Sequence, residues 1–580
     1  MYKESKRDEL NYIFNNLFNV TKGHFKLKSK LMIKERLIGY LEKSISQNWD
    51  IEALSNYKES GYSYKEIAEK ILKLHILYKE SGIIEGDKIA MIGKNSANWC
   101  VIYLATVTYG AVIVPILPDF KPEDLISIIT HSDSKLLFAD DKIYDTLDTA
   151  TIPEITAIFS LDDFRMIISG DSKIKKIFSS LDEKYSKLYP DLKREDIKFS
   201  DISNDHLAVI SYTSGTTGFS KGVMISHNSL AANIRYAQAN MPLESGDPVV
   251  SFLPLAHTFG CAFEFLFPFT LGCHITILTK TPSPQILIQA FKDIKPRLIL
   301  SVPLVVDKIY KKQLLPVISK PHMKILLAIP GINRILYKKI REKLTDTFGG
   351  RFKELVVGGA AFNADAEKFF RKIGFKFTVG YGMTECGPLI SYASWDTTKP
   401  GASGRAVDTL EVTIDSNDPI NEVGEIILRG DNVMNGYYKN EKATREIIDD
   451  KGWMHTGDLG VIDKQGNIFI KGRSKSMILG PSGKNIYPEE IESVINNKDY
   501  VTESVVISED NKLIGLIFPD YEMMKSNNIS DDQLISVLDQ TRKEVNERLP
   551  DFMKVSKFRT HPEEFEKTPK RSIKRYLYTT

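Results

Sequence analysis

Residues 207–222 read LAVISYTSGTTGFSKG, an apolar run that leads into a loop rich in glycine and hydroxyl side chains. Glycines let backbone amides approach an anion, hydroxyls donate further hydrogen bonds, and a lysine supplies positive charge for phosphate oxygens. The pattern predicts a strand followed by a phosphate-binding loop, and a triphosphate would suit it. The residues predicted to bind the phosphates are Thr213, Ser214, Gly215, Thr216, Thr217, Gly218 and Lys221.

This loop is not a P-loop, because Lys221 follows Ser220 instead of preceding a Ser or Thr as that motif requires. A surface turn is the alternative interpretation, since turns are commonly built from Gly, Ser and Thr. The remaining motifs decide between the two.

The segments before the loop alternate between helix and strand patterns. Residues 64–81 have helical periodicity, residues 88–92 form a short apolar run, and the same alternation returns over 121–131 and 135–139. Alternation of this kind is typical of parallel α/β winding, so we expect an α/β fold with doubly wound sheets. Residues 164–200, rich in Lys, Asp and Ser, are expected to form an exposed excursion.

Downstream of residue 405 the pattern changes to short strands such as LEVTID and GEIILRG, which predicts a β-rich subdomain over about 400–474. A domain boundary is expected near 472–476. The predicted organisation is a large domain over 1–474 and a small, mobile C-terminal α+β domain over 475–580, which is about the minimum size of a domain.

The amino-acid composition excludes several classes of protein. With 580 residues, 42% hydrophobic and 26% charged, the chain is globular and too long for one core. Lys and Arg number 77 against 75 Asp and Glu, so no basic field attracts nucleic acid, and no nucleic-acid partner is expected. Four scattered cysteines and an N-terminus without an apolar segment predict a cytoplasmic protein.

Residues 100–118 carry no charge and are about as long as a membrane span. Gly110, Pro115 and Pro118 interrupt this stretch, and its second half is β-branched. A buried helix followed by a buried strand is therefore the favoured interpretation over a span.

Other motifs accompany the glycine-rich loop. They are Pro254-Leu-Ala-His257, Gly358-Gly359-Ala360, Tyr381-Gly-Met-Thr-Glu385, Gly424-Glu425, Gly436-Tyr437, Trp453-Met-His-Thr-Gly-Asp458, Gly472-Arg473 and Gly483-Lys-Asn-Ile-Tyr-Pro-Glu-Glu-Ile-Glu492. In this order they resemble the adenylate-forming superfamily, which contains acyl-CoA synthetases, luciferases and the adenylation domains of peptide synthetases. The resemblance covers roughly residue 60 to the end and is strongest to bacterial long-chain acyl-CoA synthetases.

The resemblance implies how a nucleotide would be held. The Tyr381 ring would stack on adenine beside Gly382, the Thr384 hydroxyl would reach the α-phosphate, and Glu385 together with Thr216 would hold Mg²⁺. Asp458 would accept the ribose hydroxyls with Arg473 as its partner. Taken alone, Thr384-Glu385 is equally typical of a helix start, and Thr-Gly-Asp458 of a turn.

Further roles follow from the same resemblance. His257 and Gly358 would lie beside the substrate carboxylate, Gly359 and Ala360 beside the nucleotide, and Lys475 at the hinge where the small domain rotates. A core histidine is the alternative for His257. The aromatic run 259–269 could line an acyl tunnel, although a buried core helix is the commoner role of such a run.

The C-terminal segment departs from the family. Such enzymes place a catalytic lysine there, and an alignment without gaps puts Ser572 at that position. Lys570 and Lys574 flank it, and we take Lys574 as the catalytic lysine because its long stem tolerates a shift of register. A solvated basic tail, or a patch touching anionic lipid at the inner face of the membrane, is the alternative.

The predicted activity is an ATP-dependent ligase that forms a fatty acyl-CoA through an acyl-AMP, with ATP, Mg²⁺, coenzyme A and a long-chain fatty acid as cofactors and substrates. One rival is an acyl-AMP ligase or acyl-carrier-protein synthetase, which delivers the acyl group to a carrier protein. A second rival is a nucleotide-binding regulatory protein that has lost catalysis.

Overall fold

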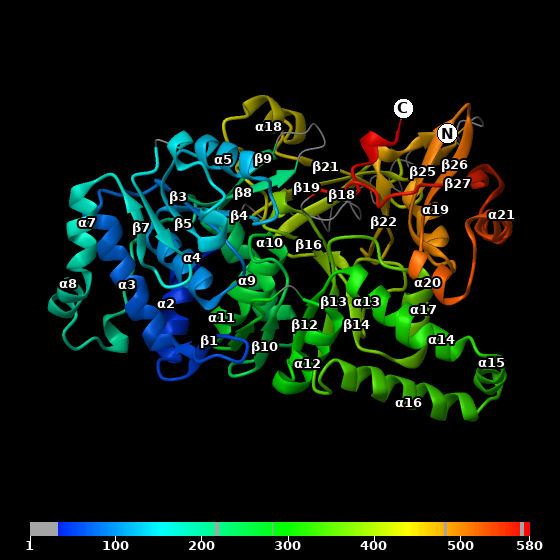
Figure 1. Cartoon of the computed structure of the whole chain (residues 1–580), viewed down its shortest axis with the longest axis horizontal. Helices are drawn as coiled ribbons and strands as arrows, with labels where there is room; N and C mark the ends of the chain where they lie inside the picture. Colours follow the sequence, from blue (N-terminus) through cyan, green and yellow to red (C-terminus); the bar gives the residue numbers. More distant parts are fainter. Residues whose placement is uncertain are drawn as a thin grey trace, which may run out of the picture.

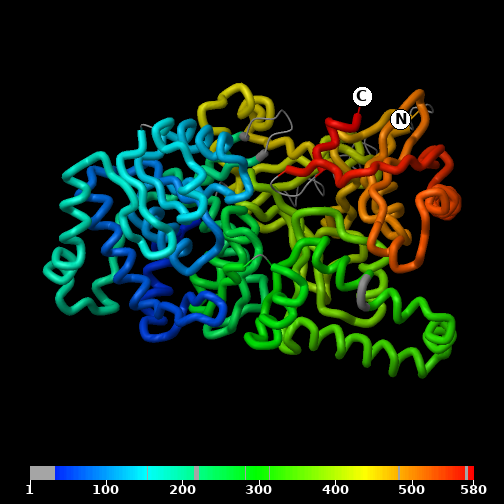
Figure 2. Tube along the Cα trace, in the orientation of Figure 1, coloured from blue at the N-terminus to red at the C-terminus, as the bar shows by residue number. Residues whose placement is uncertain are grey.

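The computed structural model describes residues 33–152, 154–214, 220–280, 282–480, 484–568 and 573–579 (Figure 1). It is an α/β protein with a large N-terminal part of mixed sheets and a small C-terminal part, as the sequence predicted. The blue and cyan part of the chain, from residue 33 to about residue 200, and the C-terminal strands lie at opposite ends of the molecule, and much of the remaining chain lies between them (Figure 2).

The largest sheet contains the two strands that flank the glycine-rich loop. Its strand order is β20 (Gly436–Tyr437), β9 (Ser220–Ser226), β8 (Leu207–Ser214), β4 (Val112–Ile116), β3 (Lys88–Ile92), β5 (Ser134–Ala139), β6 (Ala157–Ser160) and β7 (Met166–Ser169). The strands from β8 to β6 run parallel, whereas β7, β9 and β20 are antiparallel to their neighbours. The sheet is therefore mixed, with a parallel centre and antiparallel strands at both edges.

The apolar stretch 100–118 forms part of this core. The helix α4 (Ala97–Tyr109) begins at a Ser96 cap and ends at Gly110, whose φ of 91° suits glycine. The strand β4 that follows is buried at every position. Within the described residues no helix is long and apolar enough to cross a membrane. The helix-plus-strand interpretation is confirmed.

Two further sheets belong to the large part. One has the order β10 (Pro248–Ser251), β11 (His274–Ile277), β1 (Glu52–Asn56) and β2 (Gly61–Ser63), and the other has β12 (Leu298–Ser301), β13 (Glu354–Val357) and β14 (Phe377–Val379). The expectation that family-like structure starts near residue 60 is wrong, because β1 and α2 (Leu37–Gln47) already belong to this core.

The β-rich subdomain predicted around 400–474 is present. Its antiparallel sheet has the order β18 (Leu410–Asp415), β19 (Gly424–Gly430), β21 (Met454–Ile462) and β22 (Ile468–Arg473), beside a smaller sheet of β15 (Tyr381–Gly382), β16 (Leu389–Tyr392) and β17 (Arg405–Ala406).

The C-terminal part has its own cores, separate from the large one. Its elements are β23 (Ile478–Leu479), β24 (Asn485–Ile486), α19 (Pro488–Ile495), β25 (Val501–Glu509), β26 (Lys512–Pro519), α20 (Tyr521–Ser526), α21 (Asp531–Arg548) and β27 (Val555–Thr560). The division at residue 474 remains a prediction.

Helices cover the sheets. They are α3 (Tyr64–Glu80), α5 (Pro122–His131), α6 (Asp141–Tyr144), α7 (Ser172–Ser179), α8 (Leu181–Leu188), α9 (His227–Asn240), α10 (Thr258–Gly260), α11 (Phe267–Leu271), α12 (Pro284–Ile294), α13 (Pro303–Ile309), α14 (Leu315–Ile318), α15 (Pro321–Ala328), α16 (Ile332–Thr347), α17 (Ala364–Ile373) and α18 (Glu441–Ile447). Part of the expected excursion 164–200 is ordered structure, since β7 extends the large sheet and α7 and α8 pack on α3.

Candidate active site

A cleft of about 1130 Å³ lies between the large part and the C-terminal part. Most of the described residues that the sequence predicted as functional line it. They are Thr213, Lys221, His257, Gly358, Gly359, Tyr381, Gly382, Thr384, Glu385, Arg473, Lys475 and Lys574. Ala360 is exposed but is not among the lining residues. Gly215, Thr216, Thr217 and Gly218 lie outside the described residues, as does the side chain of Ser214.

Strand pairing brings the phosphate-loop lysine to the cleft. Strands β8 and β9 form an antiparallel hairpin in which Thr213 lies opposite Lys221. The Lys221 ammonium lies 4.8 Å from the centre of the Tyr437 ring. The Tyr437 hydroxyl donates a 2.9 Å hydrogen bond to Glu385 Oε1. Lys221 and Glu385 are 164 positions apart in sequence, yet both contact one buried tyrosine.

A network of buried side chains holds the Glu385 loop. Residues Thr384–Cys386 form a short 3₁₀ turn, so the helix-start interpretation of this motif describes its local shape. Asn233 of α9 donates a 3.1 Å hydrogen bond to the Cys386 carbonyl and accepts a 2.9 Å hydrogen bond from the Leu389 amide. Asn233 is buried, so these bonds fix the loop against the helix.

Asp458 lies behind the lining of the cleft and is 5% exposed. It is not in a turn, because it belongs to β21 and pairs across the sheet with Arg473 of β22. Asp458 Oδ1 lies 2.7 Å from Arg473 Nε, and Asp458 Oδ2 accepts a 2.7 Å hydrogen bond from the Tyr381 hydroxyl. Burial raises the pKa of the Asp458 carboxyl, while the Arg473 charge and the Tyr381 hydroxyl act in the opposite direction.

The other end of the cleft is apolar. Met241, Leu253, Phe259, Phe263 and Val302 line it. A side-chain carbon on Gly358 would lie 3.1 Å from the Phe259 ring, so a larger residue there would push that ring aside. His257 lines the cleft directly before α10.

The aromatic run therefore has two roles. Phe265, Phe267 and Phe269 are fully buried core residues, as the commoner interpretation predicted. Only Phe259 and Phe263 of its five phenylalanines line the cleft.

The C-terminal side of the cleft carries the charged residues Lys475, Glu489, Lys574 and Arg575 among apolar and hydroxyl-bearing side chains. Lys475 follows β22 in a short 3₁₀ turn. Lys574 Nζ lies 2.5 Å from Glu566 Oε1, and this hydrogen bond raises the pKa of the Lys574 ammonium. The next residue, Arg575, pairs with the buried Glu492. Ser572 and Lys570 lie outside the described residues.

Several lining residues had no role in the sequence prediction, among them Tyr437, Glu425 and His455. Glu425 accepts hydrogen bonds from His455 Nδ1 at 2.9 Å and from the Gly457 amide at 2.7 Å. The quoted motifs contain all three residues, but nothing in the sequence showed their partners.

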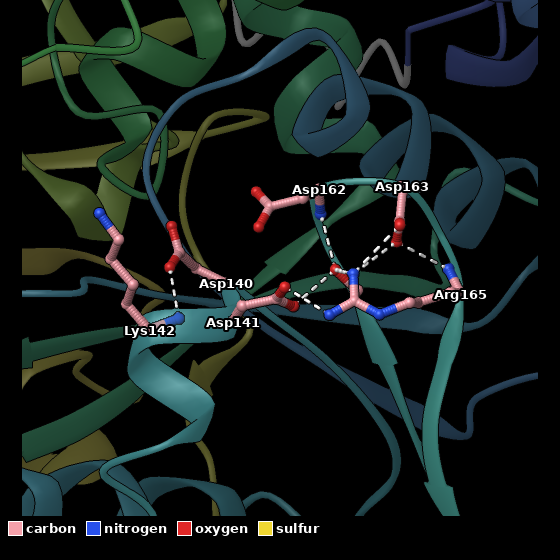
Figure 3. A network of polar contacts seen from close by, with 7 residues as sticks. Asp140, Asp141, Lys142, Asp162, Asp163 and Arg165 are labelled. Carbon is pink, nitrogen blue, oxygen red and sulfur yellow. Dashed lines mark hydrogen bonds and ion pairs between the residues drawn. The ribbon is translucent and has the colours of Figure 1, made fainter.

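A second polar cluster lies outside the cleft, at the carboxyl ends of β5 and β6 (Figure 3). Arg165 pairs there with Asp141 and, at 3.0 Å, with Asp163. The Ser160 hydroxyl donates a 2.8 Å hydrogen bond to Asp141. Because the carboxylates are already paired, this cluster stabilises the sheet edge and is not a candidate site.

The donor set fits a magnesium ion carried by a triphosphate. No group of three or more His, Cys, Asp or Glu side chains able to hold a metal occurs in the described part of the chain. Mg²⁺ usually binds through one or two carboxylates plus substrate phosphates and water. Glu385, which shares the contact to Tyr437 with Lys221 and lines the cleft, is a carboxylate of this kind.

Comparison with known proteins agrees with this geometry. The family described as "AMP-binding enzyme" matches residues 41–438, and its C-terminal domain family, "AMP-binding enzyme C-terminal domain", matches residues 475–579. The first match again starts before residue 60.

Individual relatives are distant. The long-chain-fatty-acid–CoA ligase FadD15 of Mycobacterium bovis is 27% identical, over 85% of this chain and 86% of its own length. A long-chain-fatty-acid–[acyl-carrier-protein] ligase of Arabidopsis thaliana is 26% identical over 79% and 72%. The crystal structure of ATP-bound MatB from Rhodopseudomonas palustris has a TM-score of 0.72 at 23% identity, covering 94% of this chain and 98% of that one, and shares the fold.

Proposed function

The chain belongs to the AMP-binding, adenylate-forming enzyme family, and from that premise we propose that it activates a long-chain fatty acid with ATP and transfers the acyl group to coenzyme A. The observation that carries the proposal is the shared cleft. Its one end gathers Lys221, Glu385 and Arg473, which suit a nucleotide, and its other end is apolar, which suits an acyl chain.

The first half-reaction forms an acyl-adenylate. A carboxylate oxygen of the acid attacks the α-phosphorus of ATP, and the bond from that phosphorus to the bridging oxygen breaks, releasing pyrophosphate. Lys221 and Lys574 would neutralise the negative charge that develops on the phosphate oxygens. Glu385 and Thr216 would hold Mg²⁺, which when bound supplies further positive charge to the phosphates.

The nucleoside is oriented by the residues behind the cleft. Asp458 would accept hydrogen bonds from the ribose hydroxyls, since Arg473 and Tyr381 hold its carboxylate in place. The Tyr381 ring and Gly382 would face the adenine, and Gly359 and Ala360 would lie on the same side. His257 and Gly358 would lie beside the carboxylate of the acid.

The second half-reaction makes the thioester. The thiol of coenzyme A gives its proton to solvent water, its sulfur attacks the acyl carbonyl carbon, and AMP leaves with the bonding electron pair. We propose that Lys475 marks the hinge about which the C-terminal domain rotates between the two half-reactions.

The apolar end predicts how activity depends on the acid. Each methylene buried against Phe259, Phe263 and Val302 contributes about 0.8 kcal/mol. We therefore expect KM for the acid to fall about fourfold per added methylene until the chain outgrows the cleft.

Transfer to a carrier protein is the second candidate, because one relative is named as an acyl-carrier-protein ligase. The test measures AMP and pyrophosphate release by the purified full-length chain with acids of graded chain length, offering coenzyme A or a phosphopantetheine-bearing carrier protein as acceptor. Long-chain acyl-CoA formation supports the proposal. Acylation of the carrier alone supports the second candidate, and the absence of pyrophosphate release with every acid contradicts both.

We also propose that the protein works in the cytoplasm. Its four cysteines are free thiols and all are buried, which suits a reducing compartment.

A further inference from the structure

The helical hairpin α15–α16 exposes apolar side chains to solvent. It projects below the C-terminal domain, with α16 along the lower edge of the view and α15 at its corner (Figure 1). Ile325 is 64% exposed and Ile335 is 60% exposed. We call the following residues the hairpin patch: Val317, Ile325, Ile329, Ile332 and Ile335 with the exposed cations Lys320, Lys324, Arg334, Lys338, Lys339 and Lys343.

The hairpin is built to present this patch. Gly331, at φ 89°, makes the turn between the helices, a conformation that other residues rarely adopt. One face of α16 is anchored on α12 and α17, where Leu344 is 2% exposed. The opposite face carries Ile332 and Ile335 in its first turns and Lys339 further along. Isolated exposed leucines or isoleucines are ordinary, but a cluster on one ordered hairpin indicates an interaction surface.

The charge of the patch is almost entirely positive. Between residues 315 and 345 the only acidic residue is Glu342, which pairs with Lys338 at 3.9 Å. Among the described residues, Lys320, Lys324 and Lys339 form no ion pair. Helices that combine apolar side chains with lysine and arginine lie in the interface of anionic bilayers, where each basic residue adds attraction.

We propose that the hairpin patch docks the protein on the surface of an anionic lipid bilayer. The isoleucines would enter the headgroup region and the lysines would meet lipid phosphates. The described part of the C-terminal tail suits this role less well, because Lys567, Lys574 and Arg575 are each paired with a glutamate.

Along the chain, the hairpin follows a residue of the candidate acyl site. Val302 lines the cleft and caps α13, from which the chain runs through Tyr310–Leu314 and α14 into the hairpin.

Flotation of the full-length protein with lipid vesicles tests the proposal without using activity. The protein should float with phosphatidylglycerol vesicles at low salt and remain unbound with pure phosphatidylcholine. The triple variant Lys320→Gln, Lys324→Gln, Lys339→Gln should weaken binding about fivefold per lysine, or about a hundredfold in total. Ile325→Gln with Ile335→Gln should weaken it as well, because insertion of the apolar side chains is lost.

Matched controls use exposed residues at the far end of the molecule. Lys175→Gln, Lys176→Gln, Lys187→Gln removes as many charges from α7 and α8, and Ile168→Gln with Leu188→Gln removes two exposed apolar side chains. These variants should bind vesicles as the parent chain does, and all variants should keep its thermal transition. Equal binding to neutral vesicles, or equal loss in the controls, overturns the proposal. So does a dimer in solution that dissociates on Ile325→Gln with Ile335→Gln, since the patch would then bind a second copy.

Discussion

Two walls of one cleft differ in how their charged residues are held. The nucleotide wall, defined by Lys221, Tyr437, Glu385, Asp458 and Arg473, is fixed by strand pairing and by hydrogen bonds in which one partner, Tyr437 or Asp458, is buried. The C-terminal wall, represented by Lys574, depends on an ion pair with Glu566, whose side chain is 57% exposed.

The difference matches two requirements of the proposed reaction. Residues that bind the nucleotide must be held in position beforehand, whereas residues of the C-terminal wall must be able to move. The buried Asp458 keeps its place because it lies on β21 and its partner Arg473 lies on the neighbouring strand β22. Little reorganisation of these side chains is therefore needed when negative charge develops on the phosphate during the proposed reaction. An exposed ion pair is worth about 1 kcal/mol or less and exchanges partners easily. Lys574 can therefore leave Glu566 for a phosphate group at small cost, and the C-terminal wall suits a domain that moves.

The largest expected effect falls on the nucleotide wall. Lys221→Ala should lower kcat/KM for adenylation by about 10²–10³, because the proposed mechanism uses this fixed cation beside the α-phosphorus of ATP. Pyrophosphate exchange measures this step. Lys88→Ala is the matched control, since Lys88 lies over the neighbouring Tyr438 ring at 5.5 Å but does not line the cleft. If both variants lose activity equally, Lys221 only stabilises the sheet.

A change on the C-terminal wall should separate the two half-reactions. Lys574→Ala should lower adenylation about 10²-fold while leaving thioester formation from supplied acyl-adenylate near its normal rate, because the lysine acts only on the phosphate. Lys567→Ala is the control, since its ammonium is paired with Glu503 at 2.8 Å and does not line the cleft. Loss of both half-reactions in Lys574→Ala would contradict the proposal that this lysine acts in adenylation alone.

A milder substitution tests preorganisation. Asp458→Asn keeps the shape of the side chain but removes the charge opposite Arg473, so KM for ATP should rise about tenfold with a smaller change in kcat. Initial rates at varied ATP measure it. Asp463→Asn removes a carboxylate of the same subdomain that is paired with Lys399 at 2.8 Å, and it should leave KM unchanged. A pure fall in kcat would indicate that Asp458 acts on the chemical step.

The smallest effect is expected where the C-terminal domain meets the large part. Arg548 of α21 pairs with Asp365 of α17 at 3.0 Å, and both side chains are about half exposed. Arg548→Ala should change the ratio of the two half-reaction rates by no more than about fivefold, because such pairs contribute at most about 1 kcal/mol. The variant Arg559→Ala, which breaks a pair inside the C-terminal part, is the control. A change of tenfold or more would show that this contact governs the domain position.

The sequence alone determined the element types and the motifs. The apolar run 88–92 is β3 without a shift of either end, the helical pattern over 64–81 is α3, and the strand predicted before the glycine-rich loop is β8. Hydrophobic periodicity and turn residues encode such local structure directly. The order of the motifs was also sufficient to indicate the family, which the family comparison confirmed.

Only the tertiary structure decided which residues meet. Strand register placed Asp458 opposite Arg473, and the addition of β20 to β9 placed Tyr437 between Lys221 and Glu385. Burial divided the aromatic run into core residues and the two phenylalanines of the cleft. The exposed isoleucines of the hairpin looked like core residues in the sequence, because hydrophobicity shows that a side chain prefers burial but not whether the fold covers it.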